Sequence, residues 1–303
     1  MFLKNSKNQY LISTVDFAAE SCPEAFVEYS EKMYSARLAE TLFAAFDKKI
    51  LLVSGPSASG KTTSAIKLAA AFETLGKRAV VVSMDDFYKH RTEMPVIDGK
   101  INAEVIESVE ISLLEEKMNE FALNGKAVLP VYDFATGRRR DGANPVEGEI
   151  MIVEGLHALN PLVRDRLGDA AYSIYVSPHS GYFLKDGSID RRELRFLRRL
   201  VRDYYHRASS AERTFEMWDD VSACEDVYIR PLGKTADKML DTTHPYEICV
   251  LKSEAEKILA TVGKDSPYYA PAERLLKLLS SVTPLPLSVI PEGSLLHEFL
   301  PQI

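Results

Sequence analysis

The chain has 303 residues, 46% of them hydrophobic, which is enough for one large core and excludes an intrinsically disordered protein. Its 37 basic and 44 acidic residues give a net charge of -7, so we expect no nucleic-acid partner and no anionic-membrane partner, because polyanions would be repelled overall. Three widely spaced cysteines without a CxxC motif argue against a disulfide framework or a zinc site and favour a reducing compartment.

No stretch of the chain has the pattern of a targeting or membrane segment. The first residues lack the apolar core of a signal peptide, and no apolar run approaches the roughly 18 residues that a membrane span needs. Together with the cysteine pattern, this predicts a cytoplasmic protein.

The apolar residues of the chain follow the helical period in some segments and form short continuous runs in others. Helices are predicted at 24–46, 62–75, 103–124, 190–207, 252–262 and 271–282, with a helix-like stretch at 159–167. Strands are predicted at 48–54, 78–83, 127–131, 149–154 and 171–176. Because strands alternate with helices and lack hairpin signals, we expect an α/β fold with a parallel sheet covered on both faces. A proline-containing tail after the last helix is expected to lie extended over the domain.

A phosphate-binding loop follows the first predicted strand. Its sequence, Gly-Pro-Ser-Ala-Ser-Gly-Lys-Thr at 55–62, fits the pattern GxxxxGK[ST]. Backbone N–H groups of such a loop surround the phosphates, the lysine adds a charge, and the threonine hydroxyl ligates Mg²⁺. We therefore expect ATP and Mg²⁺ to be bound by Gly55, Ser57, Ala58, Ser59, Gly60, Lys61, Thr62 and Thr63. ATP is favoured over GTP because the sequence has no guanine-recognising NKxD motif. The alternative to a phosphate-binding loop at 55–62 is a glycine turn with an incidental lysine.

Acidic residues follow two other predicted strands. Asp85 or Asp86 comes after the strand at 78–83, at the edge of the sheet where the phosphates are expected. A carboxylate there can accept the proton of an attacking hydroxyl, although either residue could instead cap a turn. Glu154 ends the strand at 149–154, a position from which an acid can contact Mg²⁺ or its bound water. Alternatively, Glu154 is simply a solvent-facing acid at the point where the strand leaves the core.

The predicted helix at 190–207 carries seven arginines in an acidic protein. One face is expected to hold the helix against the core through Leu197, Leu200, Val201 and Tyr204. Another face carries Arg195, Arg199 and Arg202. This pattern indicates a lid that clamps the transferring phosphoryl group, with a solvated basic face or a nucleic-acid patch as the alternative.

Five motifs in chain order resemble the uridine kinase and phosphoribulokinase family: GPSASGKTT, SMDDFY, PVYDFATGRR, VEGLHALN and RRLVRDYYHR. The resemblance covers about residues 48–250 and is nearest to bacterial uridine-kinase-like nucleoside kinases. It implies a P-loop NTPase fold, an ATP-dependent kinase of a small molecule, a catalytic base at Asp85 and a magnesium-linked acid at Glu154. It further implies acceptor contacts from Tyr88, Tyr132 and Phe134, and lid arginines at Arg199, Arg202 and Arg207.

The extent of the resemblance and the helices predicted outside it divide the chain into three parts. Residues 1–47 form an N-terminal helical lead-in, 48–251 a P-loop kinase domain with an arginine-rich lid, and 252–303 a C-terminal helical extension and tail. The partner implied is a small-molecule acceptor, and a homo-oligomer is left open.

Two departures from the family pattern concern the acceptor. The family's acidic, ribose-binding stretch is replaced by residues 102–110, in which Glu104 and Glu110 keep an acid in register. A base-reading histidine is replaced by Gly137, and Arg139, between two further arginines, could meet a charged acceptor. Three hypotheses stay open: a nucleoside kinase, which leads; a kinase of another alcohol, such as a sugar phosphate or a pantothenate-like acid; and a nucleotide-binding regulatory module with little turnover.

Overall fold

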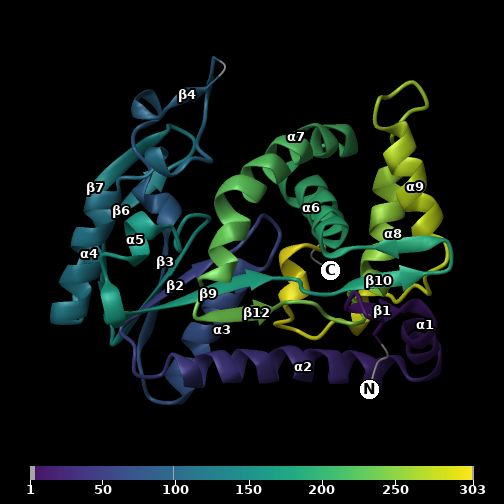
Figure 1. Ribbon diagram of the computed structural model, residues 1–303, viewed down its shortest axis with the longest axis horizontal. Coiled ribbons are helices and arrows are strands. Elements are labelled where there is room, and N and C mark those ends of the chain that lie inside the picture. Colours follow the sequence, from purple (N-terminus) through teal and green to yellow (C-terminus); the bar gives the residue numbers. More distant parts are fainter. Residues whose placement is uncertain (1–3, 98, 302–303) are drawn as a thin grey trace.

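A five-stranded parallel sheet forms the centre of the protein, as seen in a computed structural model that describes residues 4–97 and 99–301 (Figure 1). In spatial order its strands are β12 (Lys238–Asp241), β9 (Ala171–Ser177), β2 (Ile50–Ser54), β8 (Ile150–Glu154) and β3 (Ala79–Ser83). Every residue of β2 and β8 is buried, which explains their uninterrupted apolar sequences. The expected α/β fold with a parallel sheet is confirmed.

The register of the sheet brings three functional segments to one edge. Val53 of β2 and Ser83 of β3 both pair with Glu154, the last residue of β8. The phosphate loop leaves β2 one residue later, and the acidic segment leaves β3 directly. The carboxyl ends of the three strands therefore meet where a ligand of such a sheet is expected.

Helices cover both faces of the sheet. One face packs against α3 (Lys61–Thr74), which in turn contacts the long helix α2 (Pro23–Ala44). The other face packs against α4 (Ile111–Asn124) and the short α5 (Pro161–Arg164). Alternate residues of each strand serve the two cores, as the strand period requires: Leu51 faces the α3 side and Leu52 faces the α4 side.

The remaining helices pack beyond the β12 edge and above the sheet (Figure 1). They are α1 (Ile12–Ser21), α6 (Arg191–Arg207), α7 (Ala211–Cys224), α8 (Glu247–Leu259) and α9 (Tyr269–Leu279). A small second sheet joins the N-terminus to the segment before α6 through β1 (Gln9–Leu11), β10 (Gly181–Leu184) and β11 (Gly187–Ile189). Within the described residues, no helix is long and apolar enough to span a membrane.

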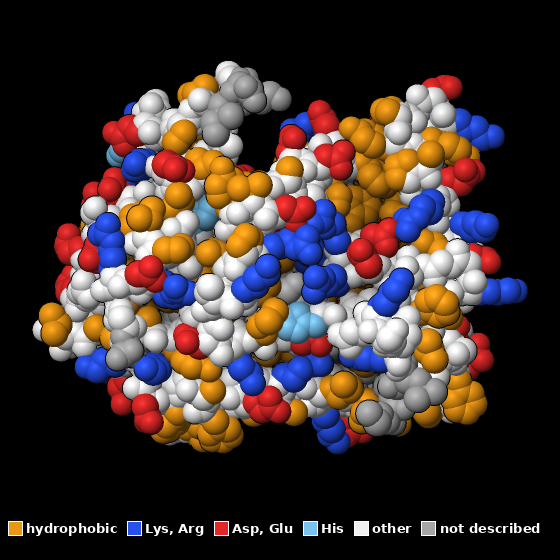
Figure 2. All heavy atoms as spheres, viewed as in Figure 1, with side chains coloured by type: hydrophobic (Ala, Val, Ile, Leu, Met, Phe, Trp, Pro, Cys, Tyr) orange, Lys and Arg blue, Asp and Glu red, His pale blue; other side chains and the backbone are white. Residues whose placement is uncertain are grey.

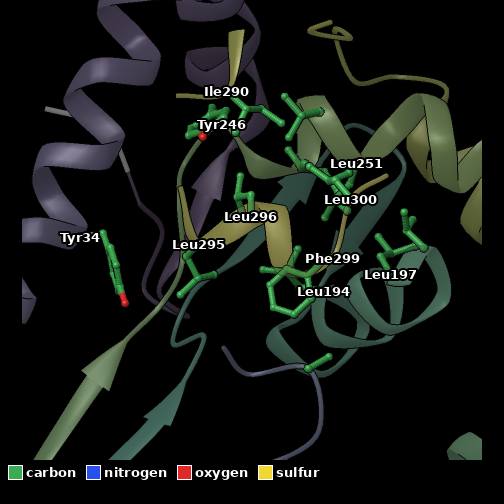
Figure 3. Close-up of a cluster of buried hydrophobic side chains, with 14 of the residues drawn as sticks. Tyr34, Leu194, Leu197, Tyr246, Leu251, Ile290, Leu295, Leu296, Phe299 and Leu300 are labelled. Atoms are coloured by element: carbon green, nitrogen blue, oxygen red, sulfur yellow. The ribbon is translucent and has the colours of Figure 1, made fainter. Parts of the chain in front are cut away.

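The C-terminal tail is part of the core rather than an extended cover. Leu295, Leu296, Phe299 and Leu300 are at most 1% exposed. Figure 3 shows them among side chains of α6 and α8, including Leu197. The expectation of a surface tail is wrong because four large apolar side chains within six residues gain several kcal/mol from burial, roughly 1.5–3 kcal/mol each.

The described residues contain three antiparallel hairpins, which corrects the expectation that the chain lacks them. They pair β4 (Val96–Ile97) with β5 (Lys100–Ile101), β6 (Lys126–Asp133) with β7 (Arg138–Glu147), and β10 with β11. Strand β7 is polar and mostly exposed, so its sequence lacks the alternation that identifies a strand. The helix expected from residue 103 begins only at Ile111, because the residues before it form turns and a 3-10 segment, Ile106–Ser108.

Candidate active site

The phosphate loop has the backbone geometry that its glycines predict. Ala58 and Gly60 lie in the left-handed region, with φ of 55° and 89°. A Cβ on Gly55 would lie 2.0 Å from the carbonyl oxygen of Val176, so only glycine fits there. The helix α3 begins at Lys61 and directs its positive end at the loop. This is the concave arrangement of N–H groups that binds phosphate.

Ser57, in the middle of the loop, is held by three partners. Its backbone N–H donates to Glu225 Oε1 at 2.6 Å, and its carbonyl oxygen accepts from Arg195 Nη1 at 2.8 Å. Its hydroxyl accepts from Arg199 Nη1 at 2.9 Å. Helix α6 and the segment after α7 therefore fix the loop from the side of the expected lid.

Three of the seven arginines of α6, Arg195, Arg198 and Arg199, are buried, and each is paired with an acid. Arg195 pairs with Glu225, and both side chains are at most 5% exposed. Arg198 donates to Glu247 from Nε at 3.0 Å, and both side chains are fully buried. Buried pairs of this kind hold elements in register, because breaking one leaves an uncompensated charge. The expected apolar stripe is wrong at one position, since Tyr204 is 42% exposed.

The three arginines predicted to form the lid surround one carboxylate. Arg199, Arg202 and Arg207 approach Asp203 at 3.1, 2.8 and 3.6 Å. Arg199 alone of the three also donates to the phosphate loop among the described contacts. The cluster therefore holds more positive than negative charge next to Ser57, where an anionic ligand would add the missing charge.

Asp85 and Asp86 have different surroundings. Asp86 accepts a hydrogen bond from the backbone N–H of Tyr132 at 3.1 Å and so fixes the acceptor-side hairpin. Asp85 lies within the electrostatic reach of Lys61 and beside the hydroxyl of Tyr88. Burial in the cleft raises the pKa of Asp85, while Lys61 and the Tyr88 hydroxyl act in the opposite direction. Only Asp85 of the two is placed to act as a base.

Glu154 and Thr62 fit a magnesium ion of the kind that nucleotides carry. The Glu154 side chain is buried, and burial raises its pKa, while Lys61 and the nearby Thr62 hydroxyl act in the opposite direction. No group of three or more His, Cys, Asp or Glu side chains suited to a metal occurs in the described part of the chain. Mg²⁺ bound with a nucleotide needs only one or two carboxylates besides phosphate oxygens and water, so the residues present are sufficient.

Three aromatic rings form a wall beyond Asp85. The ring of Tyr132 lies 5.6 Å from that of Tyr88 and 5.1 Å from that of Phe134, both in edge-to-face geometry. Tyr132 is 7% exposed, whereas Phe134 is 60% exposed. The wall thus has a buried inner end and an open outer end, suited to a flat ligand that enters from solvent.

Glu104 and His157 complete this side of the cleft. His157 Nε2 hydrogen-bonds the carbonyl oxygen of Glu104 at 2.8 Å, and burial lowers the pKa of His157. The His157 Nδ1 atom is buried without a hydrogen-bond partner among the described residues. Desolvation by the surrounding protein raises the pKa of the Glu104 carboxyl, while the nearby Arg199 and Lys61 lower it and Asp85 raises it. Sequence analysis did not select His157, although it lies within the motif VEGLHALN.

Arg139 is held by the protein itself. Its Nε atom pairs with Asp141 at 2.7 Å, its Nη1 atom donates to the carbonyl oxygen of Tyr88 at 3.3 Å, and its side chain is 12% exposed. Its backbone N–H donates to His90 Nδ1 at 3.3 Å. Arg139 therefore supports the aromatic wall, and its neighbours Arg138 and Arg140 are exposed.

The C-terminal tail supplies two contacts to the phosphate loop that sequence analysis missed. The carboxylate of Glu298 accepts a hydrogen bond from Thr63 Oγ1 at 2.6 Å. The side chain of Leu295 lies so close to Gly60 that a Cβ there would be 2.8 Å from Leu295 Cδ1. Thr63 and Glu298 are 235 residues apart in the sequence, so no local sequence pattern could have predicted their contact.

The parallel sheet and the phosphate loop after its central strand define a P-loop nucleotide-binding protein. The model of the Phosphoribulokinase / Uridine kinase family matches residues 50–248, which is more than half of the chain. The chain belongs to this family and is an ATP-dependent kinase of a small molecule.

Curated relatives point the same way at low identity. The chain is 26% identical over 191 residues to a uridine kinase of Ureaplasma parvum, a match that covers 62% of this chain and 85% of the relative. It is 28% identical over 192 residues to a uridine kinase of Lactobacillus helveticus, covering 62% and 83%. Among solved structures, one described as a possible uridine kinase from Bacillus stearothermophilus aligns with a TM-score of 0.44 and 18% identity, covering 68% of this chain and 98% of that one.

Proposed function

We propose that the protein transfers the γ-phosphate of ATP to a hydroxyl group of a nucleoside. The observation that carries this proposal is the position of Asp85 between the phosphate loop and the aromatic wall. Its carboxylate is within electrostatic reach of Lys61 on one side and lies beside Tyr88, whose ring contacts that of Tyr132, on the other. A nucleoside offers the matching combination of a flat base and a ribose hydroxyl.

In this proposal each site residue has a role set by its surroundings. The phosphate loop and Lys61 hold the nucleotide phosphates, and Arg199 with Arg202 stabilises negative charge on the transferring group. Asp85 accepts the proton of the acceptor hydroxyl or holds that hydroxyl in line. Thr62 and Glu154 hold Mg²⁺, which supplies charge neutralisation on the phosphate oxygens when bound.

The acceptor is held by the remaining residues of the cleft. The base lies against the rings of Tyr132 and Phe134, with Tyr88 between the base and Asp85. Glu104 is solvent-accessible and can accept hydrogen bonds from ribose hydroxyls.

A charged acceptor is less well supported than a nucleoside. Of the three consecutive arginines that suggested it, Arg139 is bound to Asp141 and to the Tyr88 carbonyl oxygen. Arg138 and Arg140 flank it on the exposed strand β7. The acceptor cleft itself contains the carboxylates of Asp85 and Glu104, which would repel an acidic acceptor.

An acceptor screen tests the proposal. ADP release is measured with ATP and Mg²⁺ in the presence of nucleosides, pentose phosphates or pantothenate, and phosphorylated products are identified by mass. We expect stimulation by a nucleoside and its loss in Lys61→Ala. Stimulation only by a pentose phosphate or pantothenate would overturn the nucleoside assignment, and unaltered turnover in Lys61→Ala would overturn the role of the phosphate loop.

A further inference from the structure

A second concave site lies behind the phosphate loop, on the opposite face of the sheet from α3. Tyr175 of β9 and Met239 of β12 line it, while their neighbours Ile174 and Leu240 point into the core with α3. Pro56 of the phosphate loop closes one end. The cavity of about 450 Å³ is therefore separated from the nucleotide side by the sheet and the loop.

The lining of this cavity is strongly basic. Its charged residues are Arg191, Arg192, Arg195, Arg230, Lys234 and Asp226. Figure 2 shows Lys and Arg side chains gathered near the centre of the viewed face, close to where β9 ends. This concentration stands out in a chain whose net charge is -7.

The acids nearby do not neutralise the arginines and the lysine. One carboxylate, Asp226, is shared by Arg192 and Arg230, and Arg230 Nη1 lies 2.7 Å from it. Arg195 is matched by the buried Glu225. Within residues 4–97 and 99–301, neither Arg191 nor Lys234 has an acidic side-chain partner. An anion is the ligand that this excess of positive charge favours.

The polar and apolar parts of the cavity fit a small molecule better than a bare ion. The Nε2 atom of His179 is buried without a hydrogen-bond partner in the described part of the protein, and His179 lines the cavity. Burial lowers the pKa of His179 and so favours the neutral ring, whose Nε2 atom can donate or accept one hydrogen bond. Tyr175, Met239 and Pro56 add apolar surface, and about 450 Å³ is a usual size for a ligand site.

The cavity is joined to the phosphate loop by one ion pair. Arg195, which lines the cavity, donates to the Ser57 carbonyl oxygen, and its partner Glu225 accepts from the Ser57 N–H. An anion that approaches Arg195 competes with Glu225 for it and so weakens the hold on Ser57. Binding in the cavity and nucleotide binding are thereby coupled, and such coupling acts in both directions.

We propose that this cavity binds a phosphorylated small molecule, separate from the nucleotide and the acceptor, and that its occupancy loosens the phosphate loop through Arg195 and Glu225. The occupant is a regulator of the enzyme rather than a reactant. This site is independent of which acceptor the kinase uses.

Pyrophosphate binding tests the site. Wild-type protein is saturated with Mg²⁺ and a non-hydrolysable ATP analogue, which fills the phosphate loop, and is titrated with inorganic pyrophosphate by calorimetry, with a blank for magnesium chelation. We expect one additional site. The double variant Arg191→Gln/Lys234→Gln should weaken pyrophosphate binding at this site at least tenfold. The control Arg213→Gln/Lys264→Gln, which makes the same change in charge outside the cavity, should keep the wild-type affinity within twofold. No additional site, or equal binding in both double variants, would overturn the proposal.

Nucleotide release tests the coupling. The dissociation rate of a fluorescent ATP analogue is measured after a chase with unlabelled ATP, with and without pyrophosphate. A competitor at the phosphate loop leaves this rate unchanged, because it binds only after release. We expect pyrophosphate to increase the rate at least threefold in wild type and not in Arg191→Gln/Lys234→Gln. An unchanged wild-type rate would overturn the coupling, and neither assay depends on turnover.

Discussion

The donor side and the acceptor side of the cleft are built in different ways. On the donor side, the phosphate loop is held by partners far along the chain: Ser57 contacts Glu225, and Thr63 contacts Glu298. On the acceptor side, the contacts join nearby segments, such as Asp86 with Tyr132, which are 46 residues apart. The donor side therefore depends on the folding of the whole chain, whereas the acceptor side is a local unit.

This difference explains how one scaffold can keep its chemistry while its acceptor changes. Replacement of an exposed group such as Phe134 leaves the core intact, because loops and hairpins at a sheet edge carry few buried contacts. Replacement of a donor-side partner such as Glu225 leaves a buried charge unpaired. The comparison predicts losses of activity on one side and losses of stability on the other.

The largest expected effect is on the chemistry between the two sides. Asp85→Asn removes the proposed base and should lower kcat by about 10²–10⁴-fold, with ATP affinity within about threefold of wild type. Asp86→Asn is the matched control, since its Oδ1 atom can still accept from the Tyr132 N–H, and its kcat should stay within tenfold. Steady-state kinetics and ATP-analogue titration measure both. Equal losses in the two variants would assign Asp85 a structural role.

The second prediction concerns the stability of the donor side. Glu247→Gln leaves the fully buried Arg198 without its carboxylate, so the free energy of unfolding should fall by about 3–5 kcal/mol. The control Glu216→Gln breaks the exposed pair with Arg213 and should change the free energy of unfolding by less than about 1 kcal/mol. Urea unfolding followed by circular dichroism measures both. A small loss in Glu247→Gln would show that the Arg198–Glu247 pair is not needed to hold α6 in place.

The sequence predicted the fold and the local parts of the site because their signals are local. The apolar runs of β2 and β8 and the glycines of the phosphate loop follow from neighbouring residues. The hairpin β6–β7 was missed because β7 is exposed and arginine-rich, and helix α7 was missed. The tail was predicted at the surface, since nothing near Glu298 indicates a partner at Thr63.

The third prediction concerns that tail. Glu298 lies at the first turn of α3, within the electrostatic reach of Glu154 and Arg207, so its charge opposes the approach of nucleotide phosphates. Glu298→Gln keeps an acceptor for Thr63 and removes the charge. The affinity for ATP should rise about two- to fivefold, on the order of 0.5–1 kcal/mol. The control Glu292→Gln, at an exposed position in the same tail, should change the affinity for ATP little. A fall in affinity for Glu298→Gln would mean that the carboxylate helps to bind the nucleotide.

The smallest expected effect tests the link from the aromatic wall to the base. The Tyr88 hydroxyl favours the charged form of Asp85 and so lowers its pKa, and Tyr88→Phe should therefore raise the pKa of Asp85 further above its ordinary value. Because the base must be deprotonated to accept a proton, the acid limb of kcat/KM should move to higher pH, with little change at alkaline pH.

Tyr132→Phe is the control for this shift, because it keeps the neighbouring ring and leaves the Tyr88 hydroxyl unchanged. If both variants shift the acid limb equally, the effect comes from a loosened aromatic wall. If neither shifts it, the group that titrates in the reaction is not Asp85, and the raised pKa of Glu104 makes that carboxyl the next residue to test. The pH profile thus separates the two acids of the cleft even where the single substitutions alter kcat only slightly.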